Sequence, residues 1–134
     1  MIRSILRLVL SLAYFIAGII HLVTPRPFLT IMPGWVPAPE AVVLATGMAE
    51  ILGAIGLAQG ISAPLRKAAA IELALYAVCV FPANINHFMQ DMAKPGNGLG
   101  LVYHVPRMFA QPLVVWLALW TGQVLDWPFN KKTR

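Results

Sequence analysis

Apolar residues form four long runs along the chain, and the segments between and beyond the runs hold most of its prolines and charges. Crossing about 30 Å of hydrocarbon takes about 20 helical residues at 1.5 Å each. The four runs approach that length and cover residues 5–23, 41–58, 67–85 and 108–125. The pattern predicts one all-α domain over residues 1–134, an integral membrane antiparallel four-helix bundle.

Small residues mark the helix faces expected to pack closely. The second run places Ala45, Ala49 and Gly53 at four-residue spacing, followed by Gly56 and Gly60 as a GxxxG pair. Lipid supplies no hydrophobic force between helices, so small side chains that let backbones approach favour association there. These small residues therefore support the expected antiparallel four-helix bundle.

Composition supports lipid as the solvent. The 134 residues are 59% hydrophobic and 11% charged, whereas soluble domains are about 25% charged. Fifteen charged residues cannot coat the outer faces of a soluble bundle. A soluble enzyme, a nucleic-acid-binding module and a disordered segment are therefore disfavoured, and the lipid bilayer is the expected partner. The single cysteine, Cys79, excludes an internal disulfide and is expected to be buried.

The basic residues are distributed unevenly over the two sides of the predicted membrane. Four spans place both termini on one side, which then holds seven of the ten basic residues: Arg3, Arg7, Arg66, Lys67, Lys131, Lys132 and Arg134. Arg26, Lys94 and Arg107 fall on the other side. Cytoplasmic loops carry the excess of Lys and Arg, so both termini are predicted to be cytoplasmic.

The two predicted outer loops differ from the short inner connection at residues 59–66. Residues 24–40 hold five prolines and several large apolar side chains, including Phe28 and Trp35. Proline prevents a simple helical hairpin there. This segment is expected to lie at the membrane interface or to fold over the bundle. The second outer loop is predicted at residues 86–106, with glycines that make its middle flexible.

Two acidic residues fall inside predicted spans. Glu50 lies nine residues past Ala41, close to the middle of the membrane. An ionised side chain there costs about 2.5–3.5 kcal/mol on insertion scales. Glu50 must be protonated, paired or directed at a hydrated cavity, so it is either a proton-accepting or ligand-binding group or a neutral acid between helices. Glu72 lies one to two turns from Arg66 and Lys67, so a structural ion pair or a hydrogen bond to a partner is expected for it.

The remaining polar residues gather toward the outer side. Pro82 is predicted to kink the third span, and an unwound stretch after it would let Asn84 and Asn86 both point inward. Arg107 and Gln111 are one helical turn apart at the start of the fourth span. An outward-facing pocket beneath the proline-rich segment is predicted, with these candidate ligand-binding residues: His21, Glu50, Asn84, Asn86, His87, Arg107 and Gln111.

The residue pattern indicates where this pocket lies more clearly than it indicates what the pocket binds. No two histidines have HxxxH or HExxH spacing, so no metal site is predicted. Haem between two histidines is disfavoured because the histidines are interfacial. No nucleophile accompanies a base and no phosphate-binding loop is present, so no catalytic residue is assigned. A quinone, a lipid or a small amphiphile fits the pocket, and a polar cluster that only fixes helix register is the alternative.

Motifs over nearly the whole chain carry a resemblance to a known family. They are His21-Leu22, Pro25, Phe28, Ile31-Met32-Pro33, Pro37, Thr46-Gly47, Glu50, Gly53, Arg66-Lys67-Ala68, Phe81-Pro82-Ala83-Asn84, Arg107, Gln111 and Trp116. In order and spacing they resemble the DoxX-like family of small four-span bacterial membrane proteins. The chain departs at Leu22, where such proteins often have phenylalanine.

The resemblance implies a multi-pass protein of the bacterial inner membrane. The relatives that name the family look like membrane subunits of a thiosulfate:quinone oxidoreductase, and others are tied to oxidative-stress membrane complexes. An accessory subunit of a membrane complex, with quinone as its candidate cofactor, is therefore the leading hypothesis; its partners would be other subunits or a second copy. A quinone- or lipid-binding enzyme or carrier is the alternative. An assembly chaperone, as some distant eukaryotic relatives resemble, is the second alternative.

Overall fold

The computed structural model describes residues 1–129, which form five helices and contain no strand. The helices are α1 (Ile2–Val23), α2 (Arg26–Ile31), α3 (Pro39–Ala58), α4 (Ala63–Met92) and α5 (Gly100–Thr121). The predicted all-α class is confirmed, and the four long helices overlap the four apolar runs.

Three of these helices, α1, α3 and α4, are long and apolar enough to cross a membrane. Large apolar side chains on them face outward, among them Leu12, Leu52 and Val78. Such exposed apolar helix surfaces fit lipid, so the chain has the character of a membrane protein. Within the described residues, α5 does not reach the same hydropathy, because it carries polar residues such as His104, Arg107 and Gln111. A fourth span at α5 stays a prediction.

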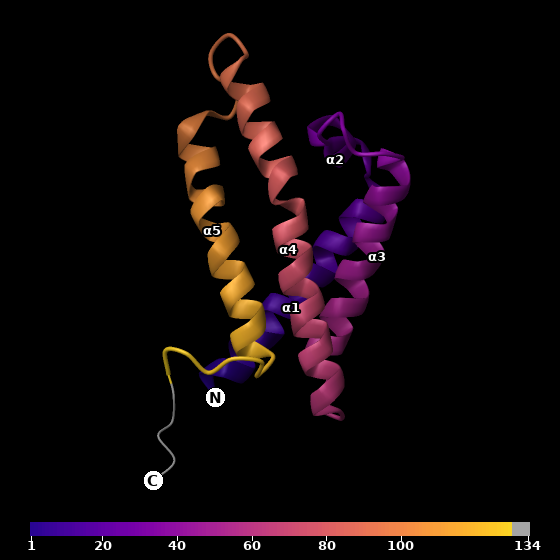
Figure 1. The fold of residues 1–134 in the computed structure, drawn as a ribbon, viewed down its shortest axis with the longest axis vertical. Coiled ribbons are helices and arrows are strands. Elements are labelled where there is room, and N and C mark those ends of the chain that lie inside the picture. Colours follow the sequence, from indigo (N-terminus) through magenta and orange to yellow (C-terminus); the bar gives the residue numbers. More distant parts are fainter. Residues whose placement is uncertain (130–134) are drawn as a thin grey trace.

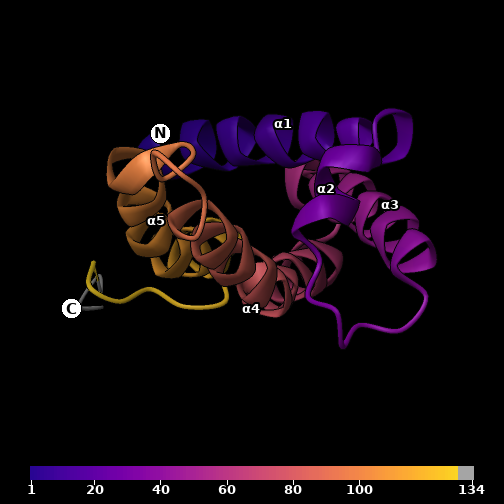
Figure 2. The same cartoon turned by 90° about the horizontal axis from the view of Figure 1, so that it is seen from above.

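The four long helices run in alternating directions, and the N-terminus lies at the same end as the C-terminal end of α5 (Figure 1). Helix α4 packs between α3 and α5, while α1 packs along α3 and has few contacts with α5. Seen from above, α1 lies obliquely across the others (Figure 2). Arg3 joins α1 to α5 at this end, because its Nε donates to the Trp120 carbonyl at 2.6 Å.

Helices α1 and α3 meet at two glycines. A Cβ placed on Gly18 would lie 2.7 Å from the carbonyl oxygen of Gly47, and one on Gly47 would lie 2.8 Å from Cβ of His21. The two backbones are therefore in direct contact, as in other membrane helix pairs with small residues. Gly56 serves the same purpose between α3 and α4, since its Cβ would lie 2.7 Å from that of Ala69.

Helix α4 corrects two predictions about the third span. It continues past residue 85 to Met92, and it passes through Pro82 without an unwound stretch. Thirty residues make a helix about 45 Å long, against about 30 Å of hydrocarbon. We infer that its last two turns stand outside the hydrocarbon, where polar protein neighbours satisfy the buried Asp91.

The second outer loop is much shorter than predicted. Helix α5 begins at Gly100 instead of residue 108 and includes Pro106, so residues 93–99 connect α4 to α5. Asp91 accepts a hydrogen bond from the Leu99 amide at 3.1 Å and thereby draws the loop back to α4. Gly98 has φ +55°, and a Cβ there would collide with the Asp91 carboxylate. The glycines therefore allow a tight reversal.

The proline-rich segment folds over the bundle, one of the two arrangements predicted for it. Helix α2 packs against α3 and α4. The ring of Phe28 stacks on His21, with 3.6 Å between centroids. From α4, Asn86 Nδ2 donates to the Ile31 carbonyl at 2.8 Å and Gln90 Nε2 donates to the Thr30 carbonyl at 3.1 Å. These contacts hold α2 as a cover at the end of the bundle opposite the N-terminus.

Candidate ligand-binding pocket

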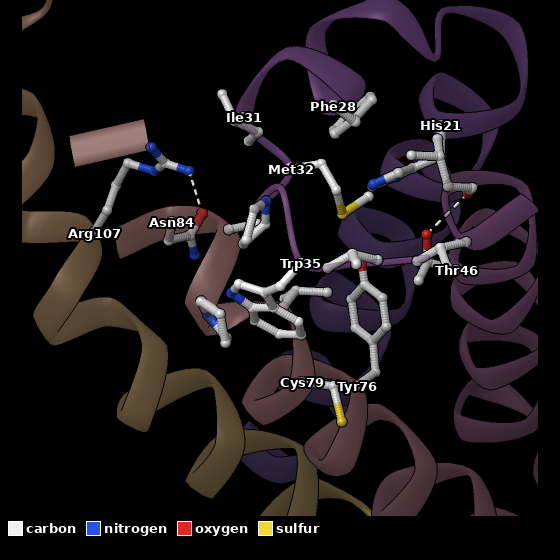
Figure 3. Close-up of a pocket in the computed structure, with 17 residues that line it drawn as sticks. His21, Phe28, Ile31, Met32, Trp35, Thr46, Tyr76, Cys79, Asn84 and Arg107 are labelled. Carbon is white, nitrogen blue, oxygen red and sulfur yellow. Dashed lines mark hydrogen bonds between the residues drawn. The ribbon is translucent and has the colours of Figure 1, made fainter. Parts of the chain in front are cut away.

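A cavity of about 340 Å³ lies beneath α2, between α3, α4 and α5. Most of its lining is apolar or aromatic, and a smaller number of polar side chains stand among these groups (Figure 3). The lining residues are His21, Phe28, Ile31, Met32, Pro33, Trp35, Val36, Val42, Val43, Thr46, Tyr76, Cys79, Val80, Pro82, Ala83, Asn84 and Arg107.

Arg107 and Asn84 form the polar edge of the pocket on the side of α4 and α5. The Arg107 guanidinium donates to Asn84 Oδ1 at 2.5 Å and to His87 Nδ1 at 3.2 Å. It also lies over the Tyr103 ring, 4.8 Å from the centroid. The guanidinium is thus fixed from three directions.

Gln111 binds the amide nitrogen of Asn84, whose amide oxygen faces Arg107. Asn84 Nδ2 donates to Gln111 Oε1 at 3.1 Å, and Gln111 Nε2 donates to the Ala77 carbonyl on α4. This chain of amides connects α5 to α4 and leaves Asn84 Oδ1 facing Arg107. Both Asn84 and Gln111 therefore act on the pocket by setting the position of the arginine.

His21 and Glu50 form the opposite side. His21 Nδ1 lies 2.9 Å from the Ala17 carbonyl oxygen and 2.7 Å from Glu50 Oε2. Both groups are buried, with Glu50 only 3% exposed. Because both neighbours of Nδ1 are acceptors, the proton of a neutral His21 belongs on Nδ1. The second ring nitrogen, Nε2, is then left for a ligand.

The structure brings most of the predicted site residues together, some lining the cavity and others supporting the lining residues from behind. His21, Asn84 and Arg107 line the cavity. Glu50 lies behind His21, while His87 and Gln111 lie behind Arg107 and Asn84. Asn86 turns away from the cavity and holds α2 by its bond to Ile31. Asn84 and Asn86 therefore take opposite roles because a continuous helix cannot point residues two apart in one direction.

Two further predictions are wrong. Cys79 is exposed and lines the pocket. Glu72 makes no salt bridge within residues 1–129; Arg66 Nη2 instead donates to Gln123 Oε1 at 2.6 Å. Glu72 lies against Gly53 of α3, in the space that a side chain at that position would fill.

Several pocket residues were not predicted as site residues, notably Thr46, Tyr76 and the aromatic pair Phe28 and Trp35. The sequence did contain a signal for the aromatic pair, since large apolar residues in a proline-rich loop need cover from the bundle. It contained no such signal for Thr46 and Tyr76, because nothing in the sequence shows that these two positions face the same cavity.

A second polar cluster adjoins the pocket at the ends of α4 and α5. His104 Nε2 lies 2.9 Å from Asp91 Oδ2, and His87 Nε2 lies 3.6 Å from the same oxygen. His104 and Asp91 are fully buried. One atom from each residue lies within 4.8 Å of the others, close enough for the three to hold a metal ion. The spacing between histidines does not reveal this cluster, because His87 is combined with Asp91, four residues further along the chain.

The surroundings of this cluster favour a structural role. Asp91 already accepts from Lys94 at 2.5 Å, from the Leu99 amide and from His104. These partners, the Lys94 ammonium foremost, hold the pKa of the Asp91 carboxyl well below its usual range. A divalent cation would stand near Lys94 and near Arg107, which donates to His87. Repulsion from two cations opposes metal binding, and the carboxylate instead ties the 93–99 loop to α4.

Replacing Asp91 by asparagine is expected to loosen this loop. The variant Asp91→Asn keeps the shape of the side chain but loses the charge that Lys94 and His104 face. Hydrogen exchange measured by mass spectrometry should show faster exchange for residues 93–100, with the α1–α3 contact unchanged. Asp126→Asn, which removes a carboxylate at the other end of the molecule, serves as the control. Unchanged exchange at the loop would contradict the structural role.

Comparison with known proteins adds a family but no activity. A family model described as a domain of unknown function, DUF8561, matches residues 10–124. The matched segment contains every residue that lines the pocket. No curated protein and no solved structure matches the chain.

Proposed function

We propose that this chain, which belongs to the DUF8561 family of domains of unknown function, is a membrane protein that binds an amphiphilic molecule beneath α2. The observation that carries the proposal is the cavity of about 340 Å³, largely apolar, with Arg107, Asn84 and His21 at its edges. Small-molecule sites have this character: a concave, mostly apolar lining with a few polar groups that fix orientation.

The lining supports a quinone or a lipid over a water-soluble metabolite. Apolar walls give a polar molecule nothing to replace its hydration, whereas they accept a ring or an acyl chain. The guanidinium of Arg107 can donate hydrogen bonds to oxygen atoms of a head group, and the free nitrogen of His21 can accept one from a head-group hydroxyl. The cavity is at the small end of the range for ligand sites, so it suits a head group with part of its chain.

The proposed topology is four spans with both termini in the cytoplasm. Among the described residues, Arg3 and Arg7 at the start of α1 and Arg66 and Lys67 at the start of α4 belong to the same end of the bundle (Figure 1). This grouping supports the positive-inside assignment. The other three basic residues of the predicted inner side, Lys131, Lys132 and Arg134, lie outside the described residues. A bacterial inner membrane is proposed from the resemblance to the DoxX-like family.

An accessory subunit of a membrane complex is the second candidate, and α5 favours it. Phe109 and Leu113 on α5 are largely exposed, on a helix less apolar than the other long ones. A less apolar helix is more easily accommodated beside a protein neighbour than in lipid alone, because a neighbour can satisfy polar groups that lipid cannot. Purification in a mild detergent with identification of bound proteins tests this role; a protein that is always isolated alone would contradict it.

Filling the cavity is expected to remove the bound molecule. Ala83 lines the pocket on α4, and Ala83→Phe places a ring there. Val78→Phe is the matched control, because Val78 lies on the same helix, is exposed and does not line the pocket. The proteins are purified in the same detergent and their extracts are compared by mass spectrometry. Wild type and Val78→Phe should retain a common molecule that Ala83→Phe has lost.

Two outcomes would contradict the proposal. One is an identical extract from all three proteins, which would place any copurifying lipid on the outer surface. The other is the absence of a retained molecule combined with no binding of decylubiquinone or dodecanoate to the wild type by native mass spectrometry. Circular dichroism of each variant verifies that α4 still forms.

A further inference from the structure

Arg107 is a cation without a matching acid. The chain has five acidic residues, Glu40, Glu50, Glu72, Asp91 and Asp126, and all lie in the described part. None of them forms a salt bridge with Arg107, whereas Asp91 is paired with Lys94 and Asp126 with Arg3. The contacts of Arg107 within residues 1–129 are to an amide, to a histidine ring and to an aromatic face. Its positive charge is therefore uncompensated at the edge of an apolar cavity.

The guanidinium is held in place but not saturated. It has five N–H donors, and two of them are directed at Asn84 Oδ1 and His87 Nδ1. Three donors remain. The planar fork of an arginine matches the two oxygens of a carboxylate or phosphate, and such paired bonds are stronger than bonds to a neutral oxygen. Because Asn84 and Tyr103 have already fixed its orientation, little further ordering is needed when an anion binds.

The other side of the pocket presents no acid to a ligand, because none of the described residues that line the cavity is acidic. Glu50 lies behind His21, with its carboxyl group 2.7 Å from the ring. The groups that also face Glu50 are Tyr14 on α1 and Glu72 and Tyr76 on α4. Of these only Tyr76 lines the cavity. Arg107 therefore decides the sign of the charge presented to a ligand.

We propose that the pocket selects an amphiphile with an anionic head, a carboxylate or phosphate on an apolar chain, and that Arg107 is the residue that selects it. The head group lies at Arg107, and the chain extends along the apolar lining toward Met32 and Trp35, which face the cavity in Figure 3. This inference rests on the proposed function, since it assigns the ligand class of the same pocket. Neutral quinones would bind more weakly than the anions.

The test compares chain-matched probes by native mass spectrometry from an uncharged detergent at pH 8. Dodecanoate and dodecyl phosphate carry the two anionic heads, dodecanol has the same chain without charge, and decylubiquinone is a neutral quinone. The full-length wild type should bind one anion per chain, at least about tenfold more tightly than dodecanol. A preference for dodecanoate indicates a free fatty acid, and a preference for dodecyl phosphate indicates a phospholipid-type head; either supports the inference.

Variants of Arg107 separate charge from folding. Arg107→Met should weaken the binding of both anions by about ten- to a hundredfold, the range expected when a hydrogen bond to a charged group is lost. The binding of dodecanol should stay unchanged. Arg107→Lys keeps the charge without the fork and should give an intermediate loss. Arg26→Met removes a cation from the same end of the molecule, outside the pocket, and should change nothing. Retained dodecanol binding shows that the pocket is still folded.

Failure of this inference differs from failure of the proposed function. Dodecanol or decylubiquinone could bind the wild type as tightly as the anions, with Arg107→Met altering the affinity for none of these probes. The inferred anion selectivity would then be wrong, while the pocket would remain a binding site. If Ala83→Phe leaves the binding of every probe unchanged, the cavity is not the site and the proposed function is wrong as well.

Discussion

Replacing Gly47 by leucine is expected to destabilise the protein by about 3 kcal/mol or more, at the upper end of what overpacking costs. A Cβ at this position would lie 2.8 Å from Cβ of His21 and 3.0 Å from the carbonyl oxygen of Gly18. The second of these neighbours is backbone and cannot rotate away. Leucine must therefore push α1 from α3, the helix that α1 packs along most closely.

The measurement is the free energy of unfolding in mixed micelles, with tryptophan fluorescence and circular dichroism followed as the denaturing detergent is increased. Gly60→Leu is the matched control, because a Cβ at Gly60 meets nothing within 4 Å. That variant should differ from wild type by less than about 0.5 kcal/mol, as surface changes usually do. Equal stability of the Gly47→Leu protein would show that α1 and α3 are not in the described contact.

The lengths of the apolar runs were sufficient to predict the four long helices but not the ends of all of them. The first two spans agree with α1 and α3 within a few residues, because apolar runs bounded by proline and charge define them. The ends of α4 and α5 were misplaced for the opposite reason. Asp91 and His104 looked like loop residues, yet they pair with each other across the two helices and stabilise the extra turns. A tertiary contact of this kind leaves no period in the sequence.

The candidate pocket could be predicted in outline because few polar residues occur in such an apolar chain. Each polar residue needs a partner in a membrane, and this argument alone grouped His21, Asn84 and Arg107. It could not distinguish lining residues from supporting ones. Asn86 holds α2 while Asn84 holds Arg107, a difference set by the phase of a helix that was expected to be unwound. The apolar wall, including Cys79, depended on how α2 folds over.

Removing either partner of the buried His21–Glu50 pair is expected to cost about 3 kcal/mol, whereas removing both should cost much less than the sum. Breaking a buried pair leaves one group without compensation in a medium of low dielectric constant, which typically costs about 3–5 kcal/mol. His21 and Glu50 are both buried and approach to 2.7 Å. His21→Phe preserves a ring that can stack on Phe28, and Glu50→Leu preserves most of the volume.

A double-mutant cycle built from these two substitutions measures the coupling directly. We expect the free energies of unfolding to give a coupling of about 2 kcal/mol for His21 and Glu50. Arg3 and Asp126 form the control pair, since they approach to the same 2.7 Å but Asp126 is well exposed, and solvent-exposed pairs contribute about 0–1 kcal/mol. A His21–Glu50 coupling no larger than that of the control would mean that the two groups are stabilised separately. Other neighbours would then stabilise Glu50, and His21 would contribute to the pocket independently of the acid behind it.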